Sequence, residues 1–216
     1  HNVAFSPLVM VLGVRLHHVV GEFVDDSVAL LFWQAFENVD WVRASLSLLR
    51  AFIAHGGRRM VCAGSCAEYD WSDGHCIESS TPLLPQSLYG VSKNAFRSIA
   101  AEAARRSGIS FAWGRIFYLY GPGEQASRLV PLIVRSQLRR EKIVCSGSDL
   151  LRDYLYVADV ASALTALFDS GLEGPVNIGS GHAISVGSIA DKIVSRLGAP
   201  QLVEFKTSGR AENTAP

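Results

Sequence analysis

The sequence has no excess of charge, no paired cysteine motif and no apolar run long enough to span a bilayer. Its 20 basic and 20 acidic residues cancel, so no overall field favours nucleic acid or an anionic membrane. The apolar stretch Val3 to Val14 is short and lacks the basic flank of a signal peptide. The four cysteines are Cys62, Cys66, Cys76 and Cys145. They lack the Cys-x-x-Cys spacing of a zinc site, which predicts no metal and reduced, buried thiols in a cytoplasmic protein.

The 216 residues, 49% of them hydrophobic, suffice for one core or for two small domains. Short apolar runs alternate with helical patterns, which predicts an α/β fold with a parallel sheet. Strands are expected at Leu8–Val14, Arg59–Ala63, Ser110–Tyr118, Ile143–Cys145, Pro175–Ile178 and Leu202–Phe205. Helices are expected at Asn38–His55, Tyr89–Ser107, Leu129–Arg140, Val157–Ser170 and Ser185–Leu197. The polar, proline-containing stretch Asp70–Ser87 is expected to be a surface loop.

The first candidate for chemistry is the pair Tyr89 and Lys93. Residues four apart share a helix face, so the phenol and the ammonium can interact with the same group of a ligand. A free tyrosine has a pKa near ~10, and we expect the lysine cation to lower the Tyr89 pKa toward the range of a general acid or base. The alternative is a helix that carries both residues by chance.

Ser65 is the second candidate, because it follows the expected strand Arg59–Ala63 at its carboxyl end. Ligands collect at this edge of open α/β sheets. A serine after a strand is usually a turn or cap residue. One connection ahead of Tyr89 and Lys93, its hydroxyl would complete a Ser–Tyr–Lys relay.

Several motifs in order resemble one family. They are AGSCAEY at 63–69, YGVSK at 89–93, RIFYLYGPG at 115–123, RDYLYVADV at 152–160 and NIGSG at 177–181. Together they are similar to the extended short-chain dehydrogenase/reductases, the NAD(P)-dependent nucleotide-sugar epimerases and dehydratases. The resemblance implies a partial Rossmann-like parallel sheet with helices on both faces, plus a small C-terminal α/β substrate-binding region. It also implies that residues 1–125 belong to the cofactor and catalytic domain, and that residues 126–216 form the substrate region, interleaved with it.

The same resemblance implies roles for individual residues. The catalytic set is Ser65, Tyr89 and Lys93. The residues beside NAD or NADP are Ala63, Tyr89, Lys93 and Phe117. The residues that hold the nucleotide sugar are Ser65, Tyr118 and Arg152; Arg152 suits the diphosphate because a guanidinium pairs with phosphate oxygens bidentately. Without the motif, Arg152 would be read as a surface arginine paired with a neighbouring aspartate. Relatives usually dimerise through two helices, so we expect a homodimer through Asn38–His55 and Tyr89–Ser107.

Departures from the family pattern bear on the reaction. The glycine-rich phosphate loop of the family is not recognisable before Leu8, and GPGEQA at 121–126 follows the catalytic helix, which is the wrong place for it. Trp41 stands where the family has an asparagine. Cys66 and Ala67 replace the Asp-Glu pair of 4,6-dehydratases, which favours epimerisation at C4 or reduction of a 4-keto sugar. The alternative is a truncated or non-catalytic member that acts as a binding or interaction domain.

Overall fold

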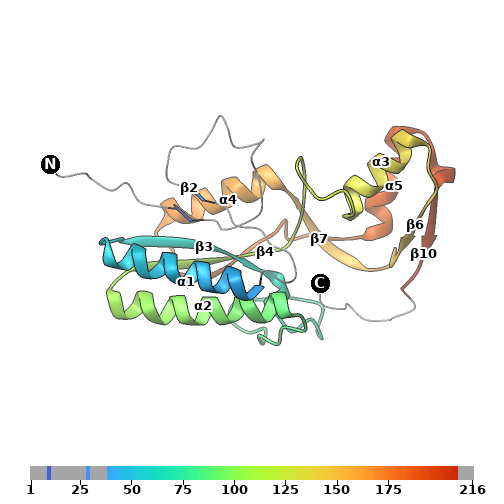
Figure 1. Ribbon diagram of the computed structural model, residues 1–216. Helices are drawn as coiled ribbons and strands as arrows, with labels where there is room; N and C mark the ends of the chain where they lie inside the picture. The colour runs from blue at the N-terminus through green and yellow to red at the C-terminus, as the bar shows by residue number, and fades with distance from the viewer. Residues whose placement is uncertain (1–8, 11–27, 30–37, 209–216) are drawn as a thin grey trace.

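The computed structural model describes residues 9–10, 28–29 and 38–208. The expected strand Leu8–Val14 is therefore described only at β1 (Val9–Met10), which pairs in parallel with β2 (Val28–Ala29). The stretch before Leu8, in which the sequence shows no recognisable glycine-rich loop, lies outside the described residues. The rest of the chain forms two groups of elements, which Figure 1 shows at its two ends.

The first group is built on a parallel three-stranded sheet. Its strands are β3 (Arg59–Ser65), β4 (Ser110–Ile116) and β8 (Gly174–Ile178), in the order β3-β4-β8. Ser65 pairs with Ile116, which pairs in turn with Ile178, so the three carboxyl ends form one edge. This edge is where parallel α/β sheets place their ligands.

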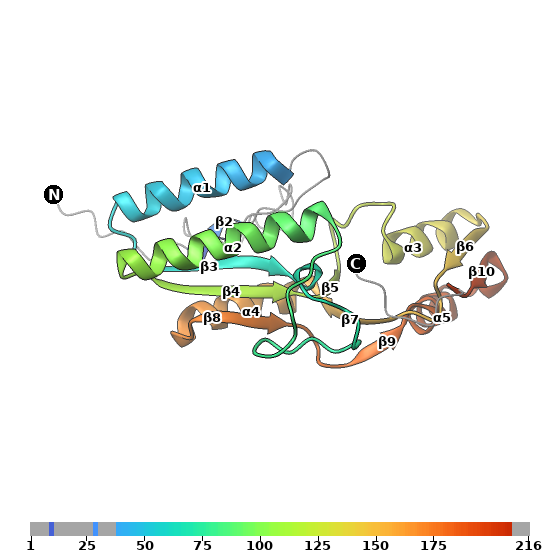
Figure 2. The same ribbon diagram turned by 90° about the horizontal axis from the view of Figure 1, so that it is seen from below.

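Helices cover both faces of this sheet. Helices α1 (Asn38–Ala54) and α2 (Leu88–Ser107) lie on one face and α4 (Val157–Ser170) on the other (Figures 1 and 2). Successive side chains of a strand point to opposite faces. Met60 and Cys62 of β3 accordingly pack against α1 and α2, while Val61 and Ala63 pack against α4. The two hydrophobic layers confirm the predicted α/β fold with a doubly covered sheet.

The second group lies beyond a smaller sheet, β5-β7-β9. Its strands are β5 (Tyr118–Tyr120), β7 (Leu151–Tyr156) and β9 (Ala183–Ser185). The remaining elements are α3 (Leu129–Arg139), β6 (Ile143–Ser146), α5 (Val186–Leu197), the turn η3 (Pro200–Leu202) and β10 (Val203–Lys206). Helices α3 and α5 pack with the parallel pair β6-β10 around a separate core that includes Ile133, Ala190 and Val194.

Two sequence-based expectations are wrong in this region. The strand expected at Ser110–Tyr118 is two strands: β4 ends at Ile116, and Tyr118 begins β5, which pairs with β7 in a different sheet. The Phe117 N–H still donates to the carbonyl oxygen of Ile178, at 3.0 Å, and the chain then leaves the first sheet. Strand β7 is not among the strands that the sequence predicts.

All four cysteines carry free thiols; Cys62, Cys66 and Cys145 are buried and Cys76 is half-buried. The described residues include no helix long and apolar enough to cross a membrane. They also include no cluster of three or more His, Cys, Asp or Glu side chains placed to hold a metal ion.

Candidate active site

Ser65 is both the last residue of β3 and the N-cap of the short 3₁₀ turn η2 (Cys66–Glu68). Its Oγ accepts a hydrogen bond from the Ala67 N–H at 3.2 Å, and its own N–H donates to Oε1 of Glu68 at 2.8 Å. This reciprocal capping box satisfies two backbone donors. The cap reading of Ser65 is therefore confirmed, and it leaves the hydroxyl proton available for a second partner.

Glu68 is a buried carboxylate that is not among the site residues predicted from the sequence. Its oxygens accept hydrogen bonds from Nε1 of Trp113, at 2.9 and 3.0 Å, and from Nε of Arg115 at 3.0 Å, besides the Ser65 N–H. The Arg97 guanidinium lies 3.9 Å away. Residues of strands β3 and β4 and of helix α2 thus surround the Glu68 side chain of the turn η2. The Ser-x-x-Glu spacing of a capping box is the sequence signal that could have pointed to it.

Tyr89 lies in the first turn of α2, where it meets Ser65. Ser87 caps the helix by accepting from the Gly90 N–H at 3.1 Å. A Cβ built on Gly90 would lie 2.3 Å from the carbonyl oxygen of Ala67, so the glycine permits the close approach of α2 to η2. The side chain of Ser65 is close enough to the Tyr89 phenol to lower its pKa. The two candidate hydroxyls are therefore brought together.

The Tyr89 pKa departs from the expectation. Burial raises it to about 12, and the Ser65 side chain opposes this rise only in part. The predicted lowering by a lysine cation is therefore wrong, since desolvation of the phenolate outweighs the favourable charge of Arg128, while Cys66 and Glu68 raise the pKa further. The phenol is protonated at neutral pH.

Lys93 projects from α2 beneath the carboxyl end of β3 and is only 3% exposed. Its Nζ donates to the carbonyl oxygen of Ala63 at 3.1 Å and lies 5.8 Å from the centroid of the Tyr89 ring. Burial lowers the Lys93 pKa to about 8, against the opposing effects of Glu68 and Cys62. The pair Tyr89 and Lys93 shares a helix face, as their spacing predicts.

Arg152 and Tyr118, the two residues expected at the sugar nucleotide, contact each other. The Arg152 guanidinium lies 5.2 Å from the centroid of the Tyr118 ring. Arg152 is buried and donates from Nη1 to the Leu151 carbonyl oxygen at 2.7 Å. Burial raises the Tyr118 pKa although the guanidinium opposes the shift.

Asp153, the neighbour of Arg152, is engaged elsewhere. Its carboxylate accepts hydrogen bonds from the Ser180 N–H at 2.8 Å, the Ser180 hydroxyl at 2.5 Å and the Gly181 N–H at 2.9 Å. It thereby ties β7 to the turn that follows β8. A Cβ on Gly179 would lie 2.7 Å from Asp153 Oδ2, so this turn requires glycine. The role of Asp153 is to fix the segment that carries Arg152.

Ala63 and Phe117 mark the boundaries of the site. Ala63 is buried and supplies the carbonyl oxygen that holds Lys93. Phe117 is half-buried between β4 and β5, with its ring centroid 6.0 Å from that of Trp71. Both therefore lie at the carboxyl edge of the first sheet.

Cys66 also belongs to this site. It directly follows Ser65, is 3% exposed, and its thiol interacts electrostatically with Tyr89, Tyr118 and Arg152. Burial raises its pKa, so the thiol is neutral. Cys66 thus stands among the candidate catalytic and substrate residues as a neutral side chain.

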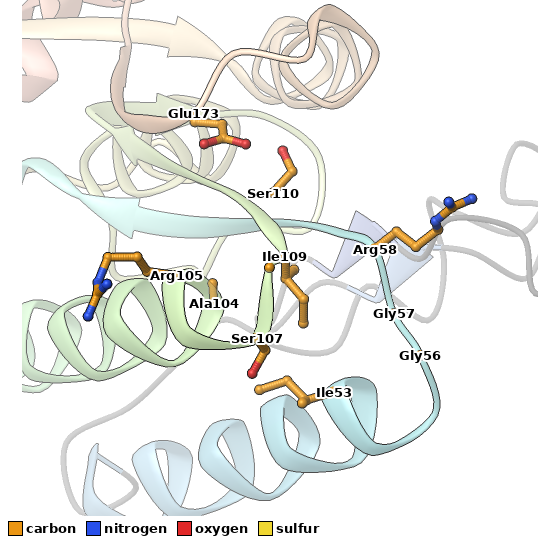
Figure 3. A pocket seen from close by; sticks show the side chains of 11 residues that line it. Ile53, Gly56, Gly57, Arg58, Ala104, Arg105, Ser107, Ile109, Ser110 and Glu173 are labelled. Carbon is orange, nitrogen blue, oxygen red and sulfur yellow. The ribbon is translucent and has the colours of Figure 1, made fainter.

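A separate open depression of about 700 Å³ lies at the opposite end of the first sheet (Figure 3). It is lined by the ends of α1 and α2 and by the starts of β3 and β4, including Ile53, Arg58, Ile109 and Ser110. None of the candidate catalytic residues borders it. The candidate site is therefore at the carboxyl edge of the sheet, where Ser65, Tyr89 and Lys93 lie.

Comparison with known proteins identifies relatives of this chain. The UDP-glucose 4-epimerase of Streptomyces lividans is 30% identical over 176 residues, which cover 74% of this chain and 54% of that protein. The chain thus spans about half the length of this relative. Two solved structures resemble it at somewhat lower identity. MoeE5 in complex with UDP-glucose and NAD has a TM-score of 0.69 at 28% identity, covering 77% of this chain and 57% of MoeE5.

The other is TunA, an NAD dependent NDP-hexosamine 5,6-dehydratase, with a TM-score of 0.72 at 27% identity, covering 83% of this chain and 63% of TunA. The neighbours therefore include both epimerases and dehydratases. The model of the NAD dependent epimerase/dehydratase family matches residues 35–179. This match spans β3, η2, α2 and β7, the elements that carry the site. The chain belongs to the NAD dependent epimerase/dehydratase family.

Proposed function

We propose that this chain carries the catalytic and substrate-binding part of an NAD(P)-dependent enzyme that epimerises a nucleotide sugar at C4 or reduces its 4-keto form. Tyr89 is the acid and base. The observation that carries the proposal is the proximity of the Ser65 and Tyr89 side chains beside the buried Lys93, at the carboxyl edge of the sheet. A phenol, a hydroxyl and an ammonium at one point are the groups that alcohol and ketone interconversion requires.

The donors at this edge suit a nicotinamide dinucleotide. An ammonium has three N–H donors, and the hydrogen bond to Ala63 uses one of them. Lys93 and Tyr89 would hold the nicotinamide ribose, with Ala63 and Phe117 beside the ring. When bound, NAD(P) supplies the exchange of a hydride with the sugar carbon.

The raised Tyr89 pKa assigns an order to the proton steps. The protonated phenol donates its proton to the C4 oxygen of a keto sugar, while the Ser65 hydroxyl orients that oxygen. In the oxidising direction the phenolate has to form, and a neighbouring cation stabilises it. We assign this task to Lys93, which has a pKa of about 8 and whose Nζ lies 5.8 Å from the centroid of the Tyr89 ring.

The substrate is held from the second group of elements. We propose the division at residue 125, with 126–216 forming the substrate region. The buried Arg152 guanidinium would pair with the diphosphate, and Tyr118 would lie between it and the sugar. The contact of Arg152 with Tyr118 and the fixing of its strand by Asp153 support this role.

Cys66 and Ala67 favour epimerisation or keto-reduction over dehydration. In the 4,6-dehydratases that the motifs resemble, the acid and the base that remove water directly follow the catalytic hydroxyl. Cys66 lies in the site with a raised pKa, and Ala67 offers only its backbone N–H, which is bonded to Ser65.

We also propose a homodimer through the outer faces of α1 and α2. These helices lie side by side (Figures 1 and 2) and expose large apolar side chains, among them Val39, Val91 and Ile99. Burial of such side chains between two copies is favourable. Sedimentation of the protein as a monomer at micromolar concentration would contradict this association.

The test of the proposed reaction is Tyr89→Phe in the protein that contains this sequence. We expect its turnover of UDP-, GDP- or dTDP-linked sugars with NAD(P) to fall by ~10²- to 10⁴-fold, the usual loss for a positioned acid–base. Tyr120→Phe, which removes a partly exposed hydroxyl from β5, is the matched control and should keep its activity. Unchanged turnover in Tyr89→Phe would disprove the mechanism. Sugar and dinucleotide binding without turnover in the parent protein would favour the non-catalytic alternative.

A further inference from the structure

The buried ammonium of Lys93 lacks a close carboxylate. In the part of the chain that the structure describes, no ion pair within 4.0 Å involves its Nζ. Glu68 is the anion that favours its charged form, but the oxygens of Glu68 already accept from Ser65, Trp113 and Arg115. A buried cation held only by one carbonyl oxygen would be costly. Another group has to offset this cost.

Trp41 of α1 is that group. The Lys93 Nζ lies 4.0 Å from the centroid of the Trp41 ring, closer than to the Tyr89 ring. A cation over the face of an aromatic ring is attracted by its quadrupole, and tryptophan gives the strongest interaction. Trp41 is 7% exposed, and the ring of Phe96 packs edge-on against it at 5.3 Å. The indole is therefore held rigidly at the position that the ammonium needs.

We propose that Trp41 is a positioning residue, whose indole face holds the charged ammonium of Lys93 against the Ala63 carbonyl oxygen and so prepares it for Tyr89 and the dinucleotide. The catalytic role of this positioning rests on the proposed function, but the interaction between the indole and the ammonium does not. Helix α1 thereby becomes part of the active-site support. The titratable groups that face Lys93 are Glu68 from η2, Cys62 from β3 and Tyr89 from α2 itself.

The experiment follows the titration of Lys93 by NMR with ¹³C-labelled lysine, in the absence of cofactor and substrate. The chain has four lysines (Lys93, Lys142, Lys192 and Lys206), and Lys93→Arg identifies the resonance. Trp41→Leu removes the ring, and Trp41→Phe keeps a weaker one. Site-specific replacement of Trp41 by increasingly fluorinated tryptophans weakens the π face while it preserves the shape. Leu49→Ala, in the same helix and core, is the matched control for loosened packing.

We expect the Lys93 pKa to fall by about one unit in Trp41→Leu, about tenfold in its dissociation constant. It should fall less in Trp41→Phe and stepwise along the fluorinated series, and it should stay unchanged in Leu49→Ala. An unchanged Lys93 pKa along the fluorinated series overturns the proposal, and this series decides even if Trp41→Leu does not fold. Since no turnover is measured, these outcomes are independent of whether Tyr89 catalyses a sugar reaction.

Discussion

Replacement of Glu68 by glutamine tests whether one buried carboxylate organises the site. The substitution preserves size and removes only the charge and one acceptor. In the parent, the two oxygens receive N–H donors from Ser65, Trp113 and Arg115, with Arg97 close by. A glutamine has one acceptor oxygen, and its amide nitrogen is a donor. At least one of these N–H groups must then face another donor.

The size of the effect follows from the burial of the pair. Glu68 is fully buried and Arg115 is 1% exposed, so the guanidinium would be left in the core without its counter-charge. Removing one partner of a buried ion pair costs roughly 3–5 kcal/mol. In a chain of this size each kcal/mol lowers the melting temperature by about 2–4 °C, so a fall of about 6–12 °C is expected from the lower figure.

The assay is thermal unfolding followed by circular dichroism, supported by urea titration. Glu102→Gln is the matched control, because Glu102 also binds two arginines, Arg105 at 2.8 Å and Arg106 at 2.7 Å, but on the surface. Exposed pairs contribute little, so its melting temperature should not change measurably. If Glu68→Gln melts within about 2 °C of the parent, the reasoning from burial is refuted.

Two further predictions concern α2. Gly90→Ala should destabilise the protein by about 1–3 kcal/mol in urea titrations through overpacking, because its Cβ would lie 2.3 Å from the Ala67 carbonyl oxygen. A stability gain of about 1 kcal/mol, which the same substitution gives in an exposed helix, would contradict this prediction. Lys93 has a pKa of about 8 in the folded protein, below its ordinary value of 10.5. Between pH 8 and pH 10.5 the unfolded chain therefore binds more protons at Lys93 than the folded protein does. The contribution of Lys93 to the free energy of unfolding accordingly rises with pH in this range. Relative to Lys93→Met, the parent should therefore gain on the order of 1–2 kcal/mol between pH 8 and pH 9.5, and a relative loss would show that the sign is wrong.

Local patterns predict the first group of elements well, because its signals lie close together in the chain. Gly108 follows the last residue of α2 as a left-handed cap, and the apolar run of β3 places Ser65 at the sheet edge. The four-residue spacing of Tyr89 and Lys93 predicts a shared face, which the structure confirms. Each of these inferences needs only the periodicity of one helix or strand.

The features that the sequence does not predict depend on contacts between segments that are distant in the chain. Apart from Arg115, the run from Phe111 to Tyr120 has no charged residue and no turn signal, so nothing in it shows that the chain changes sheets at Phe117. The Tyr89 pKa depends on burial that several elements create together, which the helix motif alone does not encode. Trp41 could be placed opposite the family's asparagine, but its contact with Lys93 requires the packing of α1 against α2.

The residues that build the site also constrain its chemistry. Glu68 is only three residues from Ser65 and would be the obvious carboxylate for an elimination. Both of its oxygens are nevertheless engaged by Trp113 and Arg115, and it lies beneath the capping turn rather than beside the hydroxyl pair. Withdrawing a proton with this carboxylate would break the ion pair that supports Ser65. The carboxylate therefore serves the geometry of Ser65 and Tyr89, which is consistent with the proposal that the phenol transfers the proton.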